Sequence, residues 1–138
     1  MKRSLLRSFD KVSILSVPMN LGQPNKGLDV APARLISSGL VDLLTKIGWK
    51  SEIIPALTTT VQSTGDFVDV VHGKTKNCAQ VGAVCEQISK YVAKECSSTT
   101  FPLILGGDHC ISIGTIHGIA KQRPNTGVVW VSRRFRVF

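Results

Sequence analysis

The residues with the clearest potential for chemistry follow an apolar run in the last third of the sequence. "FPLIL" at 101–105 is followed by Gly106, Gly107, Asp108 and His109. A neutral imidazole is a good ligand for a divalent transition metal, and the glycines permit a tight turn with close backbone approach. If the run is a strand of a parallel sheet, His109 stands at its carboxyl end, where ligands bind. The pattern predicts a metal ligand at His109, with Asp108 as helix start, orienting group or second ligand.

A purely structural interpretation explains the same residues about equally well: a glycine turn, a capping Asp108 and a histidine without function. One His and one Asp do not make a metal site, which needs three or more protein ligands. His117 is not at the four-residue spacing that places two histidines on one metal, and we expect it to pack or lie at the surface. His72 has no partner by spacing, and Cys110 has no base placed to activate it.

Other motifs with known chemistry are missing from the sequence. It contains neither a phosphate-binding glycine loop nor the G-x-S-x-G turn of serine hydrolases. The cysteines at 78, 85, 96 and 110 fit no zinc pattern. With no apolar signal-peptide core, they indicate a reducing, intracellular setting, and the helical spacing of Cys78 and Cys85 favours core packing. We expect a cytoplasmic location. The alternative is mitochondrial, because "MKRSLLRSFDK" is basic and nearly free of acids.

Length and charge exclude several classes of protein. The 138 residues suffice for one small domain, and no apolar run is long enough to span a membrane. The net charge of +8 is concentrated at the ends, since residues 1–11 and 132–138 each carry +3. The remaining residues, 12–131, carry a net charge of only +2, which does not resemble the basic stripe on the surface of a nucleic-acid-binding protein. We therefore expect no nucleic-acid or membrane partner.

Apolar periodicity predicts alternating strands and helices. Largely continuous apolar runs are typical of strands buried on both faces, and the alternation predicts an α/β fold with a mostly parallel sheet. A long loop is expected at 57–75. The predicted strands are 12–17, 51–57, 101–105 and 127–131, and the predicted helices are 32–47, 77–95 and 111–121.

Two segments resemble the arginases, the manganese ureohydrolases. "LGGDHCISIGTIHGIAKQRPNTGVVWV" is similar to the central segment of that family, and "GQPNKGLDVAPARLISSGL" resembles its opening, which favours arginase over agmatinase-type relatives. The resemblance covers residues 12–131 and implies a three-layer sandwich with a mostly parallel sheet, of the arginase/deacetylase-like kind. On this basis 1–11 is a basic leader, 12–131 the amino-terminal part of the domain and 132–138 a divergent basic tail.

The resemblance also implies an activity. Arginases hydrolyse L-arginine to L-ornithine and urea, with two Mn²⁺ ions that lower the pKa of a bridging water. By the motif, His109 is a metal ligand, and Gly106, Gly107 and Asp108 form the turn or support that ligand. No catalytic residue is assigned, substrate-binding residues remain open, and a homo-oligomer is possible in the family.

The sequence departs from the family after "GVVWV". The family continues with "DAH.D.N", whereas here Ser132 and Arg134 stand where the first Asp and the His would be. We therefore expect an amino-terminal fragment of the family fold, truncated after its fourth strand, with residues 127–131 exposed and little or no activity by itself. The alternatives are a non-catalytic isoform that associates with full-length arginase subunits, or a relative such as agmatinase.

Overall fold

A parallel three-stranded sheet organises the computed structural model, which describes residues 9–24, 26–59, 77–96 and 99–131. Strand β1 (Lys11–Val17) lies in the middle, between β2 (Lys50–Ile54) and β3 (Thr100–Gly106). The register places Ile14 opposite both Ile53 and Leu103. The predicted α/β class and parallel sheet are confirmed. Because the strands are parallel, the carboxyl ends of all three lie along the same side of the sheet, here called its carboxyl edge.

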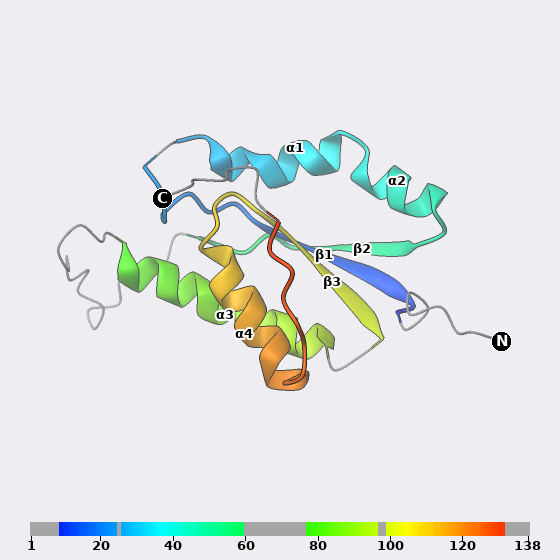
Figure 1. The fold of residues 1–138 in the computed structure, drawn as a ribbon. Helices are drawn as coiled ribbons and strands as arrows, with labels where there is room; N and C mark the ends of the chain where they lie inside the picture. Colours follow the sequence, from blue (N-terminus) through cyan, green and yellow to red (C-terminus); the bar gives the residue numbers. More distant parts are fainter. Residues whose placement is uncertain (1–8, 25, 60–76, 97–98, 132–138) are drawn as a thin grey trace.

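Helices cover both faces of this sheet (Figure 1). One face carries the 3₁₀ turn η2 (Leu28–Val30), α1 (Ala31–Ser37) and α2 (Leu40–Lys46). The other carries α3 (Cys78–Cys96) and α4 (Ile111–Gln122), which match the predicted helices closely. Among the described residues, no helix combines the length and apolar character needed to cross a bilayer.

Strand β1 separates two apolar clusters, because its successive side chains point to opposite faces. Val12 and Ile14 join Leu105 in the cluster under α1 and α2, where Ile36 and Leu44 also pack. The cluster on the other face contains Leu15, Val17, Met19, Val84, Ile88, Val92 and Cys96. Residues 12–17 are all buried, so β1 is the core of the molecule.

The prediction of a single helix over 32–47 is wrong in one respect, because the structure divides this segment into two helices at Gly39. That residue has a φ of 95°, in the left-handed region that glycine adopts without steric cost. The hydroxyls of Ser37 and Ser38 donate to the carbonyl oxygens of Arg34 and Leu35 at the end of α1. Apolar residues continue in phase across the break, which is why periodicity alone missed it.

The prediction of a strand at 127–131 is also wrong. These residues form no strand, and Val129 and Val131 are 90% and 89% exposed. A strand needs a hydrogen-bonding neighbour, and no described strand pairs with them. The exposure expected for this segment is confirmed. The predicted strand 51–57 is shorter than expected because Pro55 cannot continue the ladder.

Several predicted segments lie largely outside the described residues. They are most of the leader 1–11, the greater part of the loop 57–75, which includes His72, and the tail 132–138 with Ser132 and Arg134.

Two glycines allow α4 to lie directly against α3. A side-chain carbon at Gly118 would lie 2.7 Å from the Ser89 carbonyl oxygen, and one at Gly114 would collide with the Cys85 carbonyl oxygen. Both glycines are buried. This close backbone contact therefore fixes the position of α4 on α3. It thereby also positions the loop that carries His109.

We predict opposite effects for two glycine-to-alanine changes. Gly114→Ala forces the helices apart and should lower the free energy of unfolding by about 1–3 kcal/mol. Gly82→Ala, in α3 with open space around it, should raise it by roughly 0.5–1 kcal/mol through helix propensity. Denaturant unfolding followed by circular dichroism measures both. Equal effects of the two changes would contradict the close helix contact.

Candidate functional site

His109 lies on the loop between β3 and α4, at the carboxyl edge of the sheet. Its side chain is exposed, as the sequence predicts for a residue that projects from the rim. The imidazole contacts Trp130 edge to face, with ring centroids 5.7 Å apart and planes at 80°. The structure thus presents His109 outward, and its role as a metal ligand stays a prediction.

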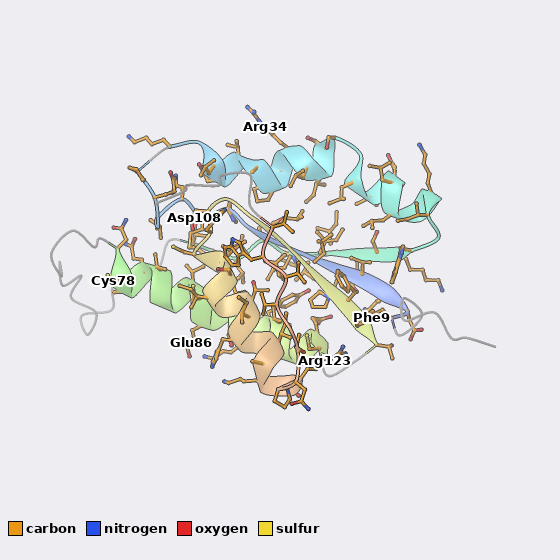
Figure 2. The ribbon with its side chains drawn as sticks, viewed as in Figure 1. Phe9, Arg34, Cys78, Glu86, Asp108 and Arg123 are labelled. Atoms are coloured by element: carbon orange, nitrogen blue, oxygen red, sulfur yellow. The ribbon has the colours of Figure 1, made fainter. Side chains whose placement is uncertain are left out.

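Asp108 is a buried residue whose carboxylate joins two loops, and this pair of bonds is here called the Asp108 clamp. Its side chain is at the end of β3 in Figure 2, and the residue is only 6% exposed. One carboxylate oxygen accepts the N–H of Cys110 at 2.8 Å, and the other accepts the N–H of Gly22 at 2.9 Å. Gly22 belongs to the loop after β1, so the carboxylate joins the segments that follow two neighbouring strands.

These bonds give Asp108 a structural part in the loop, and its part in a metal site stays a prediction. The N-cap residue of α4 is Cys110, and no side chain caps that helix. Both carboxylate oxygens are directed at backbone donors rather than toward His109 or solvent. Asp108 is therefore a positioning residue that fixes the loop carrying His109. Sequence reasoning identified Asp108 but missed Gly22, because nothing in the sequence links positions so far apart.

The two glycines before Asp108 bring the loop close to its neighbours. A side-chain carbon at Gly107 would collide with the carbonyl oxygen of Met19 and lie 2.8 Å from that of Leu28. One at Gly106 would collide with Ile111. Gly107 is needed here for close approach to backbone, which is one of the two uses expected from the sequence, whereas at Gly106 the contact is with the end of a flexible side chain.

The loop after β1 is held by further side-chain bonds that the sequence did not reveal. Asn20 donates its amide to Asp29 at 3.2 Å, and Asn77 donates to the carbonyl oxygen of Leu21 at 3.0 Å. Asn77 has a left-handed backbone, with a φ of 58°, which asparagine tolerates better than most residues. These contacts, with the Asp108 clamp, make the carboxyl edge a defined platform.

The thiols near this platform are not activated. Cys85 donates its S–H to the carbonyl oxygen of Cys110 at 3.2 Å. Burial raises the pKa of both thiols, and the nearby Asp108 carboxylate raises the pKa of Cys110 further. The packing role expected for Cys110 fits this setting. Cys78 differs from the prediction, because it is exposed at the start of α3 (Figure 2).

His117 is held by a hydrogen bond between two helices. Its Nδ1 lies 2.8 Å from the hydroxyl oxygen of Ser89, across the contact between α4 and α3. This bond agrees with the structural role expected for His117.

The donors present do not fit a manganese centre by themselves. Within the described ranges, no group of three or more His, Cys, Asp or Glu side chains is placed to hold a metal ion. His109 is a single imidazole, and the carboxylate of Asp108 is already occupied by backbone donors. Since a structural or catalytic site needs at least three protein ligands, the described residues do not form a complete metal site.

Two hollows on the surface are not lined by His109. One, of about 460 Å³, is between α1 and the end of β2 and is lined mainly by apolar residues with Asp29 at its margin. The other, of about 230 Å³, lies between α4 and residues 126–129. Neither is lined by His109 or Asp108, so neither is a substrate pocket built on the predicted ligand.

Comparison with known proteins places this arrangement among arginases. A family model described as "Arginase family" matches residues 10–132. The arginase of Bacillus subtilis (strain 168) is 34% identical over 125 residues, which cover 86% of this chain and 38% of the relative. Arginase-1 of Rattus norvegicus is 34% identical over 126 residues, covering 87% and 36%.

Solved structures agree with the sequence matches. The crystal structure of arginase from Bacillus cereus has a TM-score of 0.74 at 32% identity, and covers 88% of this chain and 38% of its own. The arginase of Bacillus caldovelox has a TM-score of 0.70 at 30% identity, covering 82% and 37%. This chain thus spans less than two fifths of the length of these relatives.

We predict that Asp108→Ala loosens the platform. Two backbone N–H groups lose their acceptor, so the free energy of unfolding should fall by roughly 1–3 kcal/mol. Hydrogen exchange of the Gly22 and Cys110 amides should accelerate by more than that of β1 amides. Asp108→Asn, which keeps one acceptor oxygen, should show a smaller effect. Unchanged exchange at Gly22 in the alanine variant would disprove the clamp.

We also predict that one thiol reacts ahead of the others. Burial raises the pKa of Cys85, Cys96 and Cys110, so at a given pH fewer of these groups are thiolates and they react more slowly. Cys78 is exposed and should react first. Timed reaction with a disulfide reagent at mildly alkaline pH, in native protein, measures this. A fast phase that survives Cys78→Ser would show the assignment to be incorrect.

Proposed function

This chain belongs to the arginase family, and we propose that it forms the part of a manganese-dependent arginine hydrolase that carries the metal ligand His109. The observation that supports the proposal is the GGDH sequence at the carboxyl end of β3, where an exposed imidazole stands on a loop whose backbone is held by Asp108. L-Arginine is the proposed substrate, and L-ornithine and urea the products, because the relatives are named arginases.

The proposed contribution of this chain is to orient one ligand. Asp108 joins Cys110 of its own loop to Gly22 of the loop after β1, and Gly107 lets the loop lie against Met19 and Leu28. A loop backbone held in this way would reduce the conformational freedom that His109 loses on binding a metal, which is the usual function of residues behind a metal site.

The metal chemistry itself requires more than these residues. When bound in a complete site, a pair of Mn²⁺ ions would supply an activated hydroxide for attack on the guanidinium carbon. The described residues offer one exposed imidazole, and the chain spans only 38% of the Bacillus subtilis relative. We therefore propose that the activity belongs to the complete family fold rather than to these 138 residues alone.

The cellular location is part of the same proposal. We place the protein in the cytoplasm, with a mitochondrial location as the alternative that its basic leader suggests. The four cysteines are free thiols, as expected in a reducing compartment.

We predict that the purified 138-residue chain releases no urea above a blank when given L-arginine and excess Mn²⁺. A single-ligand site does not hold a binuclear cluster, so the nucleophile is not generated. Colorimetric urea measurement tests this, with the arginase of Bacillus subtilis as positive control in the same buffer. Urea release that is abolished by His109→Ala would show that this chain alone completes a catalytic site.

A further inference from the structure

We propose that the hollow between α1 and the end of β2 is a binding site for a small organic cation, in which an ammonium group is carried on an apolar body. The hollow has a volume of about 460 Å³ and is here called the α1–β2 hollow. This volume is within the range of sites that bind small molecules. His109 does not line the hollow, and the proposal does not rest on the proposed function.

The α1–β2 hollow lies at the carboxyl edge of the sheet. It is lined by Ser16 and Pro18, at and after the end of β1, and by residues 53–56, at and after the end of β2. Asp29 of η2 and three residues of α1 complete the lining (Figure 1). In parallel α/β sheets, ligands bind outside the carboxyl ends of the strands. The hollow is therefore placed where folds of this class bind ligands, beside β2 rather than beside β3.

The lining favours a ligand with an apolar body. Its apolar members are Pro18, Pro32, Ala33, Ile36, Ile53, Ile54, Pro55 and Ala56. Ile53 is 50% exposed, and removing its surface from water on binding is favourable. The prolines have fixed φ angles, so this part of the lining loses little conformational freedom when a ligand binds.

The polar groups of the lining favour a cation over an anion. Among the described residues that line the hollow, Asp29 is the only charged one, and none is Lys, Arg or His. Three of the lining residues are prolines, which have no N–H to donate to an anion. A carboxylate attracts positive charge and accepts strong hydrogen bonds from an ammonium group. A phosphate or carboxylate ligand would instead meet repulsion from Asp29.

Asp29 is held in place by a neighbouring side chain. Asn20, in the loop after β1, donates its amide to Oδ1 of Asp29 at 3.2 Å. A carboxylate that is already oriented loses less conformational freedom when it binds a cation. Among the described side chains, no Lys, Arg or His forms an ion pair with Asp29, since the ion pairs found there join Lys11 to Glu52 and Lys90 to Glu86. No described cation therefore competes with a ligand for this carboxylate.

Three compounds that share one apolar body test the proposal on the 138-residue protein. Phenylbutylamine is titrated into isotope-labelled protein, and the backbone amide signals are followed by two-dimensional NMR. The amides of Ile53, Ile54 and Ala56 should shift together and saturate. Phenylbutanol, which lacks the charge, should bind about tenfold more weakly, because it loses the charge-assisted bond to Asp29. Phenylbutanoate should bind more weakly still, because its charge is repelled.

Two charge-removing substitutions separate the site from a general effect of charge. Asp29→Asn keeps the size of the side chain and should weaken binding of the amine about tenfold, with little effect on the alcohol. Asp42→Asn, at an exposed position of α2 outside the lining, removes the same charge and should leave both affinities unchanged. Ala33→Phe, at an exposed position of α1 within the lining, should abolish binding of both compounds by filling the hollow. Circular dichroism checks that each variant is folded.

Several results would overturn the proposal. They are equal binding of the amine and the alcohol, tighter binding of the carboxylate, or equal effects of Asp29→Asn and Asp42→Asn. The absence of saturable shifts at Ile53, Ile54 and Ala56 would do the same. Nuclear Overhauser contacts from another part of the chain to the side chains of Ile53 and Ile54 would show that the protein itself fills the hollow, which also contradicts a ligand site. Urea release is measured separately, so failure of the proposed function leaves this inference intact.

Discussion

Strand β1 is the constraint on which the rest of the structure depends. It comes first in the described chain, it lies in the middle of the sheet, and its residues 12–17 are all buried. Both of its neighbours are parallel to it, so the chain must return across a face of the sheet each time before it can pair. Those returns place α1 and α2 on one face and α3 on the other, and α4 then packs on α3. They also bring the carboxyl ends of the strands together, and there Asp108 joins the loop after β3 to the loop after β1.

The sequence predicted the parts of this fold that depend on local patterns. Continuous apolar runs identified β1 and β3, and helical spacing located α3 and α4 within a residue or so. Glycines followed by Asp108 and His109 correctly indicated a turn with close backbone approach. These features are local because strand burial and helix phase are both set by neighbouring side chains.

The predictions that failed depend on contacts across the fold. The break at Gly39 needs a left-handed backbone, which apolar phase does not report. Residues 127–131 have the composition of a strand, but a strand forms only where a neighbour offers hydrogen bonds, and no described strand does. The Gly22 partner of Asp108 was missed for the same reason, since it lies 86 positions away in the sequence. For residues 127–131 and for Gly22 the missing information was tertiary, whereas the break at Gly39 depends on the backbone of that residue.

The proposed role of His109 is that of one ligand of a metal site whose other ligands are not among the described residues. Titration of Mn²⁺ into the purified chain, followed by the electron paramagnetic resonance of the hydrated ion, tests it most directly. Because one exposed imidazole gives at most weak binding, the signal of hydrated Mn²⁺ should remain in proportion to the ion added. Stoichiometric loss of that signal, reversed by His109→Ala, would contradict the claim.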